Sequence, residues 1–264
     1  MKSFMKETME DCLGLNGFDA VQKFMYLSEG YSDYWAIIDK IYAFMKAIGF
    51  ALIITFFLKS LLQEATKDNL TIEQLIKSMI GLIFSVTVIS NIPAIANAFM
   101  SISDTIAAFI LADQTTADLS SMKNGKMQTL ISQATEDWAA STGVFKGTAM
   151  ALIFMILHQI AIIGLDFAII TRALDLGWKV VIAPIACADM FDGMNSPGIR
   201  HLKSLFGSAL VVALIAILTS VGSYLICGFM TADGDGKLWM AMATQLALAG
   251  AAIGANNKAK EILG

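Results

Sequence analysis

The sequence predicts an all-α protein: a polytopic integral membrane helical bundle with five or six transmembrane helices and an N-terminal interfacial helix. Three observations predict this class. Only 15% of the 264 residues are charged, whereas soluble domains average about 25%. The mean hydropathy is +0.67, and 56% of the residues are hydrophobic. Only three prolines interrupt the chain, which suits long helices. A chain with so few charges must present much of its surface to something other than water.

Six apolar stretches are candidates for spanning helices, which need about 20 mainly apolar residues to cross about 30 Å of hydrocarbon. We expect the second stretch to continue beyond Pro93 as a kinked or re-entrant helix. The fourth stretch carries Pro184 in its middle, and the sixth is short and rich in Ala and Gly, so the count is five or six. The stretches are residues 41–58, 72–92 (extended to 112), 147–171, 173–191, 205–230 and 238–254.

Polarity divides the chain into four parts. The first part carries apolar side chains near one helical face and ends in the aromatic residues Tyr34 and Trp35, which favours a segment lying at the membrane surface. The third part is the one sizeable polar segment, and we expect it to hold a helix outside the membrane. The parts are an interfacial segment (1–35), a first transmembrane pair with a kinked extension (36–112), a polar extramembrane loop (113–146) and a C-terminal transmembrane bundle (147–264).

The distribution of lysine and arginine leaves the orientation open. With five spans the two sides of the membrane carry almost equal numbers of these residues, so the positive-inside rule is nearly silent. With six spans the rule places the N-terminus in the cytoplasm.

Polar side chains within the apolar stretches are costly in lipid, so each calls for a reason. The third stretch contains His158, Gln159 and Asp166. Gln159 and Asp166 are seven residues apart and share a helical face. They are candidates for a polar stripe that lines a water-filled path or joins subunits. The alternative is a hydrogen bond between neighbouring helices.

Arg172, Asp175 and Lys179 follow at spacings that place them along one side of a helix end. We interpret the segment from Arg172 to Lys179 as a short, solvated polar turn between the third and fourth stretches. Pro184 then removes a backbone N–H inside the fourth stretch. The carbonyl that it frees must be satisfied by a neighbouring helix.

Gly250 and Gly254 form a GxxxG pattern in the sixth stretch. Small residues let the backbones of membrane helices approach closely. The pattern therefore indicates tight helix packing, either within the subunit or between subunits.

The motifs of common enzymes are absent from the sequence. It contains no GxxxxGK[ST], HExxH or GxSxG. The two histidines are too few for a histidine-based metal site, and the three cysteines show no paired spacing. Cys187 lies in an apolar run and is expected to be a small buried side chain. We predict no enzymatic activity, no cofactor and no metal.

One segment resembles a known family. The sequence RALDLGWKVVIAPIACAD (172–189) is similar to the core of the TrbL-type polytopic inner-membrane subunit of type IV secretion and conjugation systems. In that family a charged turn leads into a helix with a central Ala-Pro-Ile/Leu-Ala, which is residues 183–186 here. Residues 71–77 and 258–264 are similar to members from Gram-positive mobile elements.

The resemblance implies a multi-pass subunit of the bacterial cytoplasmic membrane with five spans, its N-terminus and polar loop outside and its C-terminus inside. It further implies a ring-like homo-oligomer that contacts membrane lipid and other secretion subunits, including the secretion ATPases. Single-stranded DNA with its relaxase would pass transiently. The family offers no catalytic residues to carry over.

A stand-alone membrane transporter or ion channel is the alternative function. His158, Gln159 and Asp166 motivate it, because polar groups inside a span are typical of substrate and ion pathways. The sequence contains no internal repeat of the kind found in many secondary transporters, which speaks against it.

Overall fold

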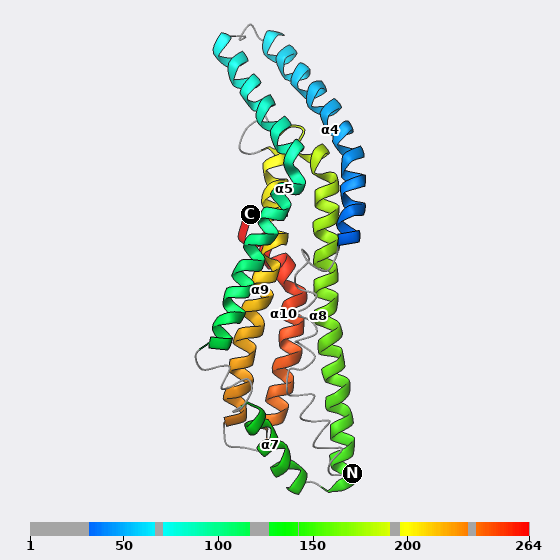
Figure 1. Ribbon diagram of the computed structural model, residues 1–264, viewed down its shortest axis with the longest axis vertical. Helices are drawn as coiled ribbons and strands as arrows, with labels where there is room; N and C mark the ends of the chain where they lie inside the picture. The colour runs from blue at the N-terminus through cyan, green and yellow to red at the C-terminus, as the bar shows by residue number, and fades with distance from the viewer. Residues whose placement is uncertain are drawn as a thin grey trace. The chain divides into compact units, whose positions relative to one another are not determined.

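A computed structural model describes residues 32–66, 71–116, 127–141, 143–190, 196–231 and 236–263. Nearly all of these residues lie in α-helices, and no strand occurs among them (Figure 1). The all-α class is therefore confirmed for the described part of the chain. The helices are α4 (Ser32–Thr66), α5 (Ile72–Thr116), α7 (Met127–Ser141), α8 (Val144–Ala186), α9 (Pro197–Thr231) and α10 (Lys237–Leu263).

Within the described residues, five helices are long and apolar enough to cross a membrane: α4, α5, α8, α9 and α10. Large apolar side chains cover their outer surfaces: Phe44 is 69% exposed, Ile83 62% and Ile163 64%. Soluble proteins rarely expose contiguous apolar surface of this kind. The fold is thus consistent with a multi-pass membrane protein. The predicted interfacial segment lies outside the described residues except for its last four, which belong to α4.

The third and fourth apolar stretches form one helix, not two. α8 runs from Val144 to Ala186 without interruption, so the prediction of a solvated turn beginning at Arg172 was wrong. The physical reason is that the charged side chains there are satisfied by α9, as described below, and need no water. α5 likewise continues past Pro93 to Thr116, as the predicted extension requires.

The chain divides into two compact units, each described by itself. Unit 1 centres on Ser103–Ile170 and Val211–Asn256, and unit 2 on Leu27–Ile102 and Thr171–Leu210. Unit 2 therefore contains α4, the first part of α5, the last part of α8 and the first part of α9.

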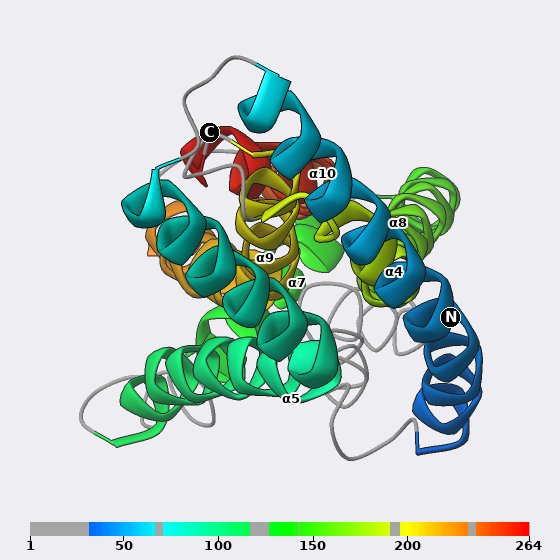
Figure 2. The ribbon, with the colours of Figure 1, turned by 90° about the horizontal axis from the view of Figure 1, so that it is seen from above.

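The core of unit 2 is a continuous apolar cluster. α4 supplies Ile53, α5 supplies Ile89, α8 supplies Leu176 and α9 supplies Leu205, each no more than 1% exposed. In Figure 2, α4 runs beside the C-terminal part of α8. Gly49 permits this approach, because a Cβ atom there would lie 2.7 Å from the Cβ of Pro184.

A buried tyrosine compensates for the proline in α5. Pro93 has no N–H, so the carbonyl of Ile89 four residues earlier loses its helical donor. The hydroxyl of Tyr42 on α4 donates a hydrogen bond to that carbonyl. Tyr42 is 5% exposed, so water cannot readily replace its hydroxyl as the donor to the Ile89 carbonyl. The pair allows α5 to pass Pro93 while it stays packed against α4.

Replacing Tyr42 with phenylalanine is expected to lower the free energy of unfolding by about 1–3 kcal/mol, because the Ile89 carbonyl is left buried without a donor. The unfolding midpoint of the purified protein in detergent measures the loss. Tyr224→Phe is the matched control, since Tyr224 is 55% exposed. Equal midpoints for the two variants would contradict the role given to Tyr42.

Cys187 lies in the same core, one residue beyond the apolar part of α8, and is fully buried. Burial, with a smaller contribution from the Asp189 carboxylate, raises the pKa of the Cys187 thiol to about 12. The expectation of a small buried side chain is confirmed for this cysteine. A thiol with a raised pKa stays protonated at neutral pH, and only the thiolate reacts.

A variant that keeps Cys187 but carries Cys12→Ser and Cys227→Ser tests this environment. We expect a maleimide to label the folded variant very slowly at pH 8 and the denatured variant completely. Quantitative labelling of the folded protein within minutes would show that Cys187 is not buried.

Unit 1 is held by contacts among α5, α8, α9 and α10. The rings of Phe154 and Trp239 lie with their centroids 4.7 Å apart. The hydroxyl of Ser103 accepts a hydrogen bond of 3.3 Å from the backbone N–H of Ala213. Serine at a helix contact is typical of membrane bundles, where small polar residues connect helices.

Candidate functional site

A cluster of polar side chains in unit 2 joins α8 to the first part of α9. Arg172 and Ser208 are fully buried, and Lys179 is 7% exposed. Buried charges are rare in any protein and are retained only when they are paired. We call this group the α8–α9 polar cluster, and its members are Arg172, Asp175, Lys179, His201, Ser204 and Ser208.

Helical spacing brings these residues together. The three members from α8 are separated by three and four residues, so they follow one side of the helix. Ser204 and Ser208 are four apart on α9. The start of α9 is fixed by Ser196, whose hydroxyl accepts a 3.4 Å hydrogen bond from the Ile199 N–H, and by Pro197 in the first turn. Ser before Pro is a strong signal for a helix start.

The centre of the cluster is an ion pair bridged by a hydroxyl. Lys179 Nζ lies 2.8 Å from Asp175 Oδ2 and donates a 2.9 Å hydrogen bond to the Ser204 carbonyl. It also donates to the Ser208 hydroxyl. That hydroxyl donates in turn to Asp175 Oδ2 at 2.5 Å. The Lys179 ammonium group therefore neutralises the Asp175 carboxylate, and the Ser208 hydroxyl helps to hold it in place.

The edges of the cluster bind main-chain carbonyls. Arg172 Nε and Nη2 each lie 3.4 Å from a carbonyl of α9, those of Ser208 and Ala209. His201 Nε2 lies 2.9 Å from the carbonyl of Lys179 on α8. The contacts run in both directions between the helices, so the cluster fastens α8 to α9.

The chemistry of the cluster favours packing over catalysis. The one carboxylate, that of Asp175, is engaged by Lys179 and Ser208 and is therefore not free to act as a base. Within the described part of the chain, no three His, Cys, Asp or Glu side chains lie close enough to hold a metal ion. What the geometry provides is a rigid joint between two helices.

His158 lies in unit 1 and makes an interhelical contact. Its Nδ1 is 3.1 Å from Oε1 of Gln245 on α10, and the two side chains are 6% and 0% exposed. The alternative of a hydrogen bond between neighbouring helices is therefore confirmed for His158. Gln159 is exposed and Asp166 partly exposed, and neither bonds to a described residue. For these two, a stripe facing a water path or another subunit stays a prediction.

The two remaining candidates differ in their surroundings. Pro184 is buried against Gly49, where a Cβ would come within 2.7 Å of its carbonyl oxygen. Around Gly250 and Gly254 a Cβ would meet no atom within 4 Å. The GxxxG pattern therefore makes no tight contact among the described residues of the subunit, and its role between subunits stays a prediction.

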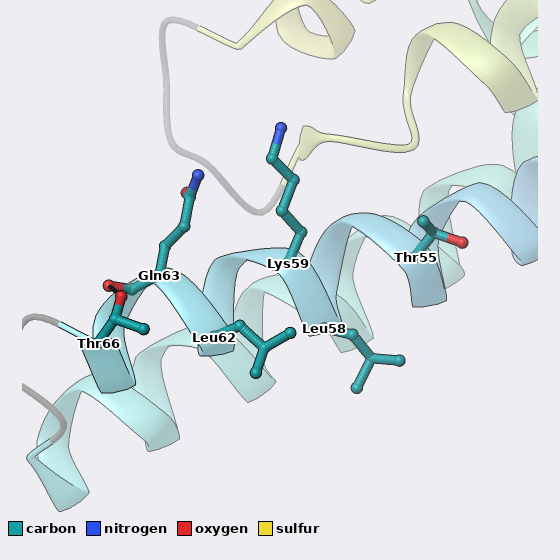
Figure 3. Close-up of a pocket in the computed structure, with 6 residues that line it drawn as sticks. All are labelled: Thr55, Leu58, Lys59, Leu62, Gln63 and Thr66. Atoms are coloured by element: carbon teal, nitrogen blue, oxygen red, sulfur yellow. Dashed lines mark hydrogen bonds between the residues drawn. The ribbon is translucent and has the colours of Figure 1, made fainter.

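A groove of about 430 Å³ lies along the end of α4. In Figure 3, Lys59 and Gln63 point to one side of the helix, and Leu58 and Leu62 point to the other. The groove contains one charged side chain and no second titratable group with which an acid–base pair could form. It supports no reaction. Its lining residues are Thr55, Leu58, Lys59, Leu62, Gln63 and Thr66.

No family model, curated protein or solved structure matches this chain.

Four residues that matter here were missed in the sequence, namely His201, Ser204, Ser208 and Gln245. Ser204 and Ser208 form an i, i+4 polar pair beside an apolar run, and Gln245 is an isolated amide in the sixth stretch. Both are signals of interhelical bonding in membrane helices. They identify a residue in need of a partner, but they do not say which helix supplies it.

Replacing Gln245 with leucine is expected to destabilise unit 1 by about 1 kcal/mol, the size of an interhelical hydrogen bond in a membrane protein. His158 then loses its partner on α10. The measurement is the unfolding midpoint in detergent, with Gln159→Leu as the matched control because Gln159 is exposed. A larger loss in the control than in Gln245→Leu would refute the assignment.

Proposed function

We propose that this protein is a membrane-embedded channel or scaffold component of a type IV secretion (conjugative DNA-transfer) machine, forming part of the translocation path in the bacterial cytoplasmic membrane. The observation that carries the proposal is the position of the segment 172–189, whose sequence resembles the TrbL-type subunits. In this fold the segment packs unit 2 together: Arg172 and Lys179 bind α9, and Pro184 contacts α4.

A segment used in this way fits a scaffold. The side chains of Arg172, Asp175 and Lys179 are each engaged by α9 of the same unit, so this part of the segment determines how the two helices are held. An enzyme would instead be expected to direct some of these groups into an open cleft. Each of the five long helices exposes large apolar side chains, which suit contact with lipid and with membrane-embedded partners.

The partners proposed are those of a secretion core. They are further copies of this chain in a ring-like homo-oligomer, other type IV secretion subunits including the secretion ATPases, and membrane lipid. Single-stranded DNA with its relaxase is the proposed transient cargo. Gly250 and Gly254 are proposed as a contact between copies, because a Cβ at either position would meet no atom of the described residues within 4 Å.

Transfer between cells tests the proposal. With the gene deleted, we expect conjugative transfer of the resident plasmid or element to be lost while growth stays normal, and a copy supplied in trans should restore it. Unchanged transfer after deletion would refute the proposal. Retarded growth with normal transfer would redirect the search to another process.

A stand-alone transporter or ion channel is the second candidate. Gln159 and Asp166 favour it, because they lie on one face of α8 and bond to no described residue. Purified protein in liposomes should then show selective flux of ions or small solutes, and Asp166→Asn should reduce it. Liposomes without flux above the protein-free background would exclude this candidate.

A further inference from the structure

Between Thr87 and Ser101, the exposed side chains on the outward face of α5 are no longer large and apolar. Over about 22 Å of helix, the side chains that point away from the unit 2 core are small or neutral and polar. All are exposed. We call them the α5 polar face: Thr87, Asn91, Ala94, Asn97, Ala98 and Ser101.

The surroundings of this face set it apart from the rest of the helix. One to two turns earlier, the outward residues Ile80, Ile83 and Phe84 are large and apolar, between 50% and 62% exposed. Ile89 and Ile92, on the opposite side of the same turns, are completely buried in the unit 2 core. Lipid contact explains the earlier apolar residues but not the polar face that follows them.

Hydrogen bonding within the helix leaves the two amides of this face, Asn91 and Asn97, with unused donors and acceptors. The Thr87 hydroxyl donates 2.8 Å to the Ile83 carbonyl, and Asn91 Nδ2 donates 2.8 Å to the Thr87 carbonyl. An amide has two N–H donors and an oxygen acceptor. Asn91 therefore keeps one donor and its Oδ1 beyond that bond, and Asn97 makes no bond to a described residue. Hydrocarbon chains offer neither donors nor acceptors.

We infer that the α5 polar face packs against a helix of a second copy of this chain. The inference rests on the homo-oligomer of the proposed function and names the surface that forms it. Ala94 and Ala98 provide the small-xxx-small spacing that lets two helices approach closely. Asn91 and Asn97 are both donors and acceptors, so identical amides on another copy can complement them. The face carries no charge that would attract ions or phosphate.

The test measures self-association of the full-length protein in nanodiscs or mild detergent by light scattering, over a range of protein concentrations. The double variant Asn91→Leu/Asn97→Leu is expected to raise the dissociation constant about tenfold, the effect of two interhelical polar contacts. Ala94→Leu/Ala98→Leu should weaken association at least as much by blocking close approach. The matched control is Ala43→Leu/Ala47→Leu, exposed alanines at the same spacing on α4.

The inference is overturned if the α5 variants associate like the wild type, or if the α4 control dissociates as strongly as they do. The variant Ala98→Cys, in a chain whose native cysteines are replaced, provides a second measurement. Rapid labelling by a charged methanethiosulfonate in membranes would show a water-lined surface and would also overturn the inference. Loss of association in the α5 variants, together with unchanged DNA transfer after deletion of the gene, would refute the proposed function and leave this interface standing.

Discussion

Replacing Asp175 with asparagine is expected to destabilise the protein by about 3–5 kcal/mol, the loss seen when one partner of a buried ion pair is removed. Lys179 lies 2.8 Å from the lost charge, and its side chain is only 9% exposed. Its ammonium group would stay buried beside Ser208 with no carboxylate to neutralise it. The unfolding midpoint in detergent and the yield of folded protein from membranes measure the effect.

Two further variants make the Asp175 result specific. Asp39→Asn removes an exposed acid from α4 and should leave the midpoint within about 0.5 kcal/mol of the wild type, as for most surface substitutions. Asp175→Leu/Lys179→Leu removes both charges and should recover part of the loss, because the Lys179 ammonium is no longer buried without its carboxylate. A wild-type midpoint for Asp175→Asn would show that the cluster is not an ion-paired joint.

Replacing Gly49 with alanine is expected to destabilise unit 2 by about 1–3 kcal/mol, the usual range for overpacking a close contact. The new Cβ would lie 2.7 Å from both the Cβ and the carbonyl oxygen of Pro184. Both atoms belong to a rigid ring or to the backbone, so neither can rotate away. α4 and α8 would have to separate, which would also disturb the core packed between them.

Gly250→Ala is the control for this variant. A Cβ at residue 250 meets no atom within 4 Å, and alanine has a higher helix propensity than glycine by about 1 kcal/mol. The control is therefore expected to be neutral or stabilising in the isolated subunit. If both glycine variants lost the same stability, the effect would come from glycine replacement in general and not from the contact with Pro184.

Much of the fold could be predicted from the sequence because membrane helices depend on local composition. The apolar stretches beginning at residues 41, 72, 205 and 238 each correspond to a helix. The second of these helices, α5, continues past Pro93. The error concerned Arg172 to Lys179. Hydropathy treats three charges in eight residues as a segment that needs water, although polar groups of another helix can replace water.

For the same reason, only some of the residues of the candidate site could be predicted from the sequence. The carbonyls that receive Lys179 and Arg172 belong to residues 25 and 36 positions later in the chain, and the partner of His158 is 87 positions away. A single sequence shows which residues need partners. It does not show which helices will be neighbours, because that depends on the packing of the whole unit.

The α8–α9 polar cluster also constrains how the protein is made. An arginine or lysine at the centre of a newly inserted helix costs about 2.5–3.5 kcal/mol each. α8 leaves the ribosome before α9, so Arg172 and Lys179 emerge when the carbonyls of Ser204 and Ser208 do not yet exist. The later part of α8 should therefore wait at the translocon or in the headgroup region until α9 arrives. Helix insertion and helix pairing then become a single step of biogenesis, and a nascent chain that stops after α8 is expected to be a substrate for membrane proteases.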